Sequence, residues 1–173
     1  GSEEFTVSVT DGEFTDLQTI TVTVLAINDA PVAITGLSGT TSEDQSVVIT
    51  LSGSDIDGDN LTYSLDTDAS NGSVVLDGNL ATYTPTADFN GDDSFTFIVS
   101  DGVLTDTADV TLSVTAVNDV PVADDGSAAG FEDTSVDIIL SASDIDGDLL
   151  EYLLDQDSAD GFVTIVDDVA TFI

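Results

Sequence analysis

The sequence contains no lysine, arginine, histidine or cysteine, whereas 35 of its 173 residues are Asp or Glu. Without cysteine no disulfide can stabilise the fold, and without cysteine and histidine the usual ligands of zinc, copper and iron are missing. The net charge of −35 would repel nucleic acid and anionic membranes, so neither is expected as a direct partner. The chain also offers no trypsin-type cleavage site, which suits an extracellular protein.

Long apolar runs are absent as well. No run approaches the roughly 18 residues of a membrane-spanning segment, and no stretch has the pattern of a signal peptide. Because 41 % of the residues are hydrophobic, the chain can bury a core, and disorder is not expected. We expect a soluble portion of a larger secreted protein, with one or two domains.

The acidic residues are clustered. Asp55-Ile56-Asp57-Gly58-Asp59 recurs 89 residues later as Asp144-Ile145-Asp146-Gly147-Asp148. Two carboxylates about 5 Å apart repel by roughly 3 kcal/mol at an effective dielectric constant near 20, and no side-chain cation offsets this. Hard divalent cations bind such oxygen clusters, and Ca²⁺ accepts their loose geometry better than Mg²⁺ does. The sequence therefore predicts calcium sites.

The rest of the chain repeats with the same period of 89 to 90 residues. Asn28-Asp29-Ala30-Pro31 returns as Asn118-Asp119-Val120-Pro121, and Glu43-Asp44 returns as Glu132-Asp133. We predict the end of one repeat at 1–29, a complete repeat at 30–119 and the beginning of a third at 120–173.

Within the complete repeat the hydrophobic period is two, which indicates β-strands. Seven strands are expected, near 31–36, 46–52, 60–66, 73–77, 80–85, 93–100 and 106–117. Gly pairs with Asn or Asp between them supply turns. Seven short strands in a repeat of this length are typical of an immunoglobulin-like sandwich, so the fold class is all-β, with tandem Greek-key β-sandwich repeats.

Several of these motifs resemble those of cadherins. The segment 21–31 is similar to the cadherin inter-domain linker, and 52–65 is similar to the Asp-x-Asp loop that leads into a Tyr-Ser-Leu strand. Together with 90–95 and 99–102, the whole chain resembles the bacterial cadherin-like tandem repeats of large secreted adhesins. Ala26 and Ala116 depart from animal cadherins, which carry an acid there, so fewer ligands or a different ion count is expected at each junction.

The resemblance implies calcium sites at the junctions between consecutive sandwiches. Carried over position by position, it gives one set around Asn118 and a second around Asn28, with Asp59 and Asp148 as auxiliary ligands. The first set comprises Glu43, Asn118, Asp119, Asp144 and Asp146. The second comprises Asn28, Asp29, Asp55, Asp57 and Asp101.

Other interpretations of these residues stay open. Asp55 to Asp59 could be a solvated Asp-Gly turn, or with Asp66 an EF-hand loop, although Asn60 replaces the glycine of that loop and strands flank it. Glu43 could be a surface acid, and Asp11 and Asp101 could be turn residues. Tyr63 and Tyr152 fit a core better than a sugar-stacking site.

The function predicted from the sequence is mechanical: a calcium-rigidified extender repeat of an extracellular adhesin or filament, at the cell surface or in the matrix. The alternative is a module that binds polysaccharide or another copy of itself. Catalysis is not expected, because a sandwich of this size offers no obvious cleft and the chain has no histidine base or cysteine nucleophile.

The repeats begin and end out of phase, which predicts a partner for each end. The strands within 3–27 of one copy could complete the sandwich begun by 120–173 of the next, giving a head-to-tail filament in which Asp11 joins the site of Asp119, Asp144 and Asp146. Adjacent repeats of one longer polypeptide would give the same geometry.

Overall fold

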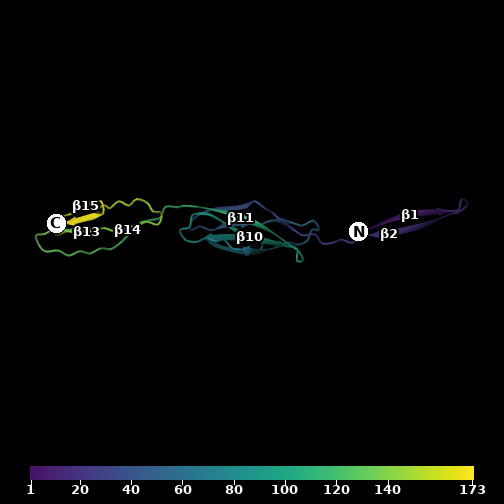
Figure 1. Ribbon diagram of the computed structural model, residues 1–173, viewed down its shortest axis with the longest axis horizontal. Coiled ribbons are helices and arrows are strands. Elements are labelled where there is room, and N and C mark those ends of the chain that lie inside the picture. The colour runs from purple at the N-terminus through teal and green to yellow at the C-terminus, as the bar shows by residue number, and fades with distance from the viewer.

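The computed structural model describes all residues, 1–173, and consists of strands, turns and connecting segments. Three parts lie in a row along the long axis (Figure 1). We name them the N-terminal hairpin (1–27), the central sandwich (30–117) and the C-terminal unit (120–173). No helix is present that could cross a lipid bilayer.

The N-terminal hairpin consists of β1 (Ser2–Thr10) and β2 (Thr15–Thr23), which pair antiparallel around a turn at 11–14. Its alternating pattern gives one apolar face, yet no residue of either strand is buried and Phe5 is 51 % exposed. The turn lies at the end of the molecule farthest from the C-terminus (Figure 1).

The central sandwich has two main sheets and a small third pair. One sheet has the order β4-β11-β10-β7, the other has the order β5-β9-β8, and β3 pairs with β6. The strands are β3 (Val32–Ala33), β4 (Leu37–Ser42), β5 (Val47–Thr50), β6 (Gly53–Ser54), β7 (Thr62–Thr67), β8 (Gly72–Asp77), β9 (Leu80–Pro85), β10 (Gly91–Ser100) and β11 (Thr105–Thr115).

The core lies between these sheets. Every second residue of β10 and β11 points inward, as period-two alternation dictates. The largest fully buried side chains include Tyr83, Phe95, Phe97, Leu51, Val99 and Val110. Tyr63 packs against this core with its ring centroid 6.4 Å from that of Phe97, as expected for a core aromatic. The predicted all-β, immunoglobulin-like sandwich is confirmed.

The expected strands differ from the observed ones in two places. The expected strand at 31–36 is only β3, and the polar segment Leu37–Ser42 forms β4 by parallel pairing with β11. A Cβ at Gly39 would lie 2.9 Å from Ile49 Cγ1, so this glycine lets β4 pack closely on the core. The short strand β6 was also missed, because Gly53-Ser54 has no hydrophobic alternation.

The C-terminal unit contains β12 (Val122–Ala123), β13 (Val136–Ile139), β14 (Ala142–Ser143), β15 (Val163–Val166) and β16 (Val169–Phe172). β13, β16 and β15 form one sheet, and β12 pairs with β14. The register repeats that of the central sandwich 89 residues later, since Val47 opposite Tyr83 becomes Val136 opposite Phe172.

Candidate metal centre

Carboxylates gather where the central sandwich meets the C-terminal unit, and we name this group the second junction. One carboxylate oxygen from each of Glu43, Asp119 and Asp146 lies within 4.8 Å of the others. Glu43 follows β4, Asp119 lies in the segment between the two parts, and Asp146 lies in the loop after β14. The structure thus brings together acids from both sides of the junction and from the connecting segment.

Glu43 is the buried member of the second junction, only 3 % exposed. Its Oε1 accepts a hydrogen bond from the Val117 amide, and its Oε2 accepts one of 3.4 Å from Asn90 Nδ2. A buried carboxylate without a cation is costly, because burial removes the water that would solvate its charge. Glu43 is therefore not an ordinary surface acid, because it is buried at the end of the sandwich that meets the C-terminal unit.

The Asp-x-Asp-Gly-Asp loop is held in shape by its own first carboxylate. Asp144 Oδ1 accepts hydrogen bonds from the amides of Asp146, at 3.0 Å, and Asp148, at 3.2 Å. Asp146 Oδ2 in turn accepts the Asp119 amide at 2.7 Å, which connects the loop to the connecting segment. Asn118 Nδ2 donates to the Asp119 carbonyl oxygen.

Asp119 lies at the centre of the second junction. Its Oδ2 is buried and has no hydrogen-bond partner. Partial burial, followed by the charges of Asp88, Asp146, Glu43 and Asp44, raises the pKa of Asp119. Burial and these neighbouring charges therefore destabilise the ionised form of Asp119 in the folded state, and a bound cation would relieve this cost.

A second group at this junction was missed by the sequence prediction. Carboxylate oxygens of Asp44, Asp88 and Asp119 also lie within 4.8 Å of one another, and the Asp88 amide donates to Asp44 Oδ1. Asp44 and Asp88 both have positive φ, 61° and 60°, a conformation that Asp tolerates better than most residues. Asp88 and Ala116 line the same recess, so Asp88 supplies an acid close to the position where Ala116 lacks one.

The first junction, around Asn28 and Asp29, has hydrogen bonds equivalent to those that Asp144 and Asp146 accept at the second junction. Asp57 Oδ2 accepts the Asp29 amide at 2.8 Å, and Asp55 Oδ1 accepts the amides of Asp57 and Asp59. Asp55 Oδ2 is buried without a partner, like Asp119 Oδ2. This network leaves an oxygen of Asp55 without a partner, and a cation could bind it.

A carboxylate from the turn between β10 and β11 takes part in the first junction and has no equivalent at the second. At the first, Asn28 Nδ2 donates to Asp101 Oδ2 at 2.9 Å, so the turn between β10 and β11 joins the group. Hydrogen bonds from the Leu104 amide, the Asn28 side chain and the Val103 amide lower the pKa of Asp101. At the second junction no such carboxylate is present. Its counterpart, Asp11, lies in the hairpin turn, where the Phe14 and Glu13 amides lower its pKa.

Asp93 is an acid with a structural role. Its carboxylate accepts hydrogen bonds from the amides of Ser70, Asn71 and Ser94 and from the Tyr83 hydroxyl. Burial acts to raise the pKa of Asp93, but these hydrogen bonds outweigh it and lower the pKa. Burial and the Asp93 carboxylate raise the pKa of Tyr83 to about 12. Asp93 therefore links β10 to β9 through its hydrogen bond with Tyr83, and it is not a candidate metal ligand.

The chemistry of the second junction fits a hard cation. It offers several carboxylate oxygens, one of them orphaned, and the chain has no Lys or Arg that could neutralise them. Carboxylate and carbonyl oxygens in an irregular arrangement suit Ca²⁺, which takes six to eight oxygen ligands. Glu43, Asp44, Asp88, Asp119 and Asp146 would hold the ion.

Comparison with known proteins supports the fold. Residues 28–113 match the family described as Bacterial Ig domain. The extracellular cadherin domains 1–4 of protocadherin gamma B7 superpose with a TM-score of 0.56 at 15 % identity, covering 99 % of this chain and 48 % of that one. No curated protein matches the chain.

Two other solved structures superpose with lower TM-scores. Drosophila N-cadherin EC1-4 gives a TM-score of 0.48 at 14 % identity, covering 99 % of this chain and 49 % of that one. An endo-fucoidan hydrolase of glycoside hydrolase family 107 gives 0.43 at 19 % identity. The chain spans 29 % of the length of that hydrolase. The family match and the protocadherin superposition indicate an immunoglobulin-like, cadherin-like fold.

Proposed function

We propose that the chain is a calcium-rigidified extender of an extracellular adhesin or filament. The starting point is an immunoglobulin-like domain with carboxylate clusters at both of its ends. The observation that carries this proposal is the second junction, where acids from the central sandwich, the connecting segment and the C-terminal unit converge within 4.8 Å. In this proposal the chain belongs to the bacterial cadherin-like repeats, with 30–119 as a complete repeat between the partial repeats 1–29 and 120–173.

The mechanical role follows from where the acids lie. Without a cation, the repulsion among Glu43, Asp119 and Asp146 opposes a fixed junction. A divalent ion that is bound by all three converts the repulsion into attraction and ties the two parts to the segment between them. A row of such junctions would hold an adhesive tip away from the cell, at the surface or in the matrix. The partners are adjacent repeats or other copies, and no catalytic role is proposed.

The first test separates the junction from the fold. We expect Asp146→Ala to weaken calcium binding at the second junction at least about tenfold, because even indirect partners of metal ligands typically contribute 10- to 100-fold. The central sandwich should keep its stability in EDTA within about 0.5 kcal/mol, since Asp146 lies outside its core. Calorimetric titration with Ca²⁺ and thermal unfolding followed by circular dichroism measure the two quantities.

Asp77→Ala is the matched control, because it removes an exposed acid at the end of β8 that belongs to neither carboxylate group of the second junction. It should leave calcium binding unchanged. If Asp146→Ala bound calcium as the unaltered chain does, or unfolded the central sandwich, the assignment of the site to the second junction would be wrong.

A further inference from the structure

The sheet β5-β9-β8 of the central sandwich carries an apolar patch on its outer face. Val48 lies opposite Thr82 on one side of β9, and Val75 lies opposite Thr82 on the other side. Val48 is 57 % exposed, Val75 is 67 % exposed and Leu80 is 43 % exposed. Successive side chains of a strand point to opposite faces, so these residues alternate with the core residues of the same strands. We name the four residues the outer patch.

The face around the outer patch carries little charge. Among the outward residues of β5, β9 and β8, only Asp77, at the end of β8, is acidic. The outer face of the sheet β4-β11-β10-β7 is different, because it carries Asp66, Asp92 and Asp109 and its one apolar outward residue is Ile98. The apolar outward residues of the central sandwich therefore gather on the sheet β5-β9-β8.

The pairing of these strands does not require valine at the two patch positions. In the C-terminal unit, Asp137 stands at the position of Val48 and accepts a hydrogen bond of 2.7 Å from Thr171 Oγ1. Thr164 stands at the position of Val75 and also lies opposite Thr171. The same three strands thus pair in the same register with polar residues, so the two valines have a reason other than strand pairing.

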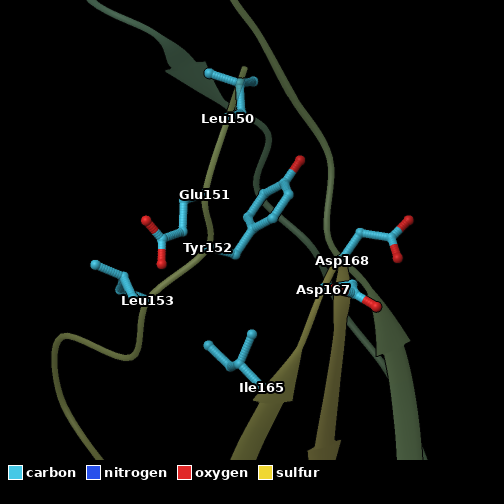
Figure 2. Close-up of a pocket in the computed structure, with 7 residues that line it drawn as sticks. All are labelled: Leu150, Glu151, Tyr152, Leu153, Ile165, Asp167 and Asp168. Carbon is cyan, nitrogen blue, oxygen red and sulfur yellow. The ribbon is translucent and has the colours of Figure 1, made fainter.

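The turn beside the outer patch is also uncharged. Its residues are Gly78 and Asn79, whereas Asp167 and Asp168 form the equivalent turn of the C-terminal unit. Figure 2 shows these two acids at the turn between β15 and β16, where together with Glu151 they line an acidic recess. In a chain with 35 acidic residues, an apolar and nearly uncharged face is suited to contact with another molecule.

We propose that the outer patch packs face to face against the outer patch of a second copy of this chain. A two-fold axis that runs along β9 above Thr82 places Val48 of each copy against Val75 of the other. The row is apolar on both sides of Thr82, so it has the self-complementarity that an isologous contact requires. Sheets that pack in this way lie about 10 Å apart, with their side chains interdigitated.

Charge favours a second copy as the occupant of the outer patch. Two chains of net charge −35 repel each other, and the outer patch is the face on which they approach with the fewest acids between them. A basic partner would instead be attracted to the acidic junctions and to the sheet β4-β11-β10-β7. The contact needs no calcium, so it does not depend on the proposed function.

The size of the face determines the strength of the contact. Three strands about 4.8 Å apart and five residues long cover roughly 14 Å by 17 Å. This area is well below the roughly 800 Å² per partner of a stable complex, so the dimer should form only at high protein concentration. Salt screens the repulsion between the two acidic chains, so association should increase with the concentration of NaCl, which is the opposite of a contact held by ion pairs.

NMR spectra of the full chain, recorded over a range of concentrations in EDTA and high NaCl, test the proposal. We expect concentration-dependent amide shifts that are largest within 46–50, 73–77 and 80–84. Sedimentation equilibrium should show a dimer of twice the 17.8 kDa chain mass, with a fraction that rises with protein and with salt.

Two substitutions taken from the equivalent sheet of the C-terminal unit should act in opposite directions. Val48→Asp introduces the residue found at 137 and should weaken association at least about tenfold, because the contact buries the unpaired charge twice. Asp77→Val introduces the residue found at 166 and should strengthen association about tenfold, because it removes the one acid of the face. Thr111→Asp is the control, since it adds the same charge to the outer face of the other sheet and should have little effect.

A chain that stays at 17.8 kDa at millimolar concentration and high salt would overturn the inference. Association that Val48→Asp and Thr111→Asp weaken equally would also overturn it, because net charge rather than the outer patch would then control the contact. Because the measurements are made in EDTA, a monomeric result leaves the proposed calcium sites untouched, and a chain that dimerises without any response to calcium would contradict only the proposed function.

Discussion

Saturating Ca²⁺ is expected to raise the melting temperature of the chain by roughly 10 °C or more over its value in EDTA. An ion that binds only the native state at 100 times its dissociation constant adds about 2.7 kcal/mol to the free energy of unfolding. Each kcal/mol raises the melting temperature of a domain of this size by about 4–8 °C. The ion would act on Asp119, whose charged form is disfavoured by burial and by four neighbouring carboxylates.

Mg²⁺ at the same ionic strength is the control for this thermal shift. General screening of the net charge of −35 would be the same for both ions, so it cancels in the comparison. Mg²⁺ demands near-ideal octahedral geometry and gives up water reluctantly, so its effect should be clearly smaller. Equal shifts with the two ions would indicate screening rather than a calcium site.

Replacing Glu43 with glutamine should change the melting temperature in opposite directions with and without calcium. The substitution keeps the shape and an oxygen for the Val117 amide but removes a charge that is only 3 % exposed. In calcium we expect binding at least about tenfold weaker, which lowers the stability by about 1.4 kcal/mol and the melting temperature by roughly 5–10 °C. In EDTA the variant should be more stable than the unaltered chain, because one repelling charge is gone.

Glu4→Gln provides the comparison for this reversal. It removes one charge from an exposed glutamate on the hairpin that belongs to neither carboxylate group of the second junction, and should have little effect in either condition. A Glu43→Gln chain that lost stability equally in calcium and in EDTA would show that the carboxylate serves the fold alone.

The sandwich could be predicted because its core strands alternate strictly. β10 and β11 alternate buried and accessible residues along most of their length, and this period is visible in the sequence. β4 could not be found in the same way. Its six residues are mostly polar, and it is a strand because β11 offers it an edge and Gly39 allows close approach. Pairing with a distant strand determined this element, rather than local pattern.

The C-terminal unit also shows that a strand depends on its partner. Residues 151–156 contain Tyr152 and apolar neighbours, as β7 does, yet they form no strand in the absence of a partner. A sequence pattern indicates which residues suit a strand. Whether the strand forms depends on the hydrogen-bonding groups beside it, and those lie in a separate part of the chain.

Some of the candidate ligands could be predicted from the sequence and others could not. Glu43, Asp119 and Asp146 were predicted because they recur at the repeat period and match the cadherin pattern, and the structure brings them together. Asp88 was missed because its counterpart one repeat earlier would precede Gly1 and one repeat later would follow Ile173, so comparison within the chain could not mark it. Asp44 recurs as Asp133, but repetition alone did not distinguish a ligand from a turn residue.

Small-angle X-ray scattering of the chain, at a concentration at which it is monomeric, tests the central claim most directly. If calcium joins the two sides of the second junction, its addition should lengthen the maximum dimension and sharpen the distance distribution, and EDTA should reverse both changes. Scattering curves that superimpose in calcium and in EDTA would contradict the claim that calcium makes the junction rigid.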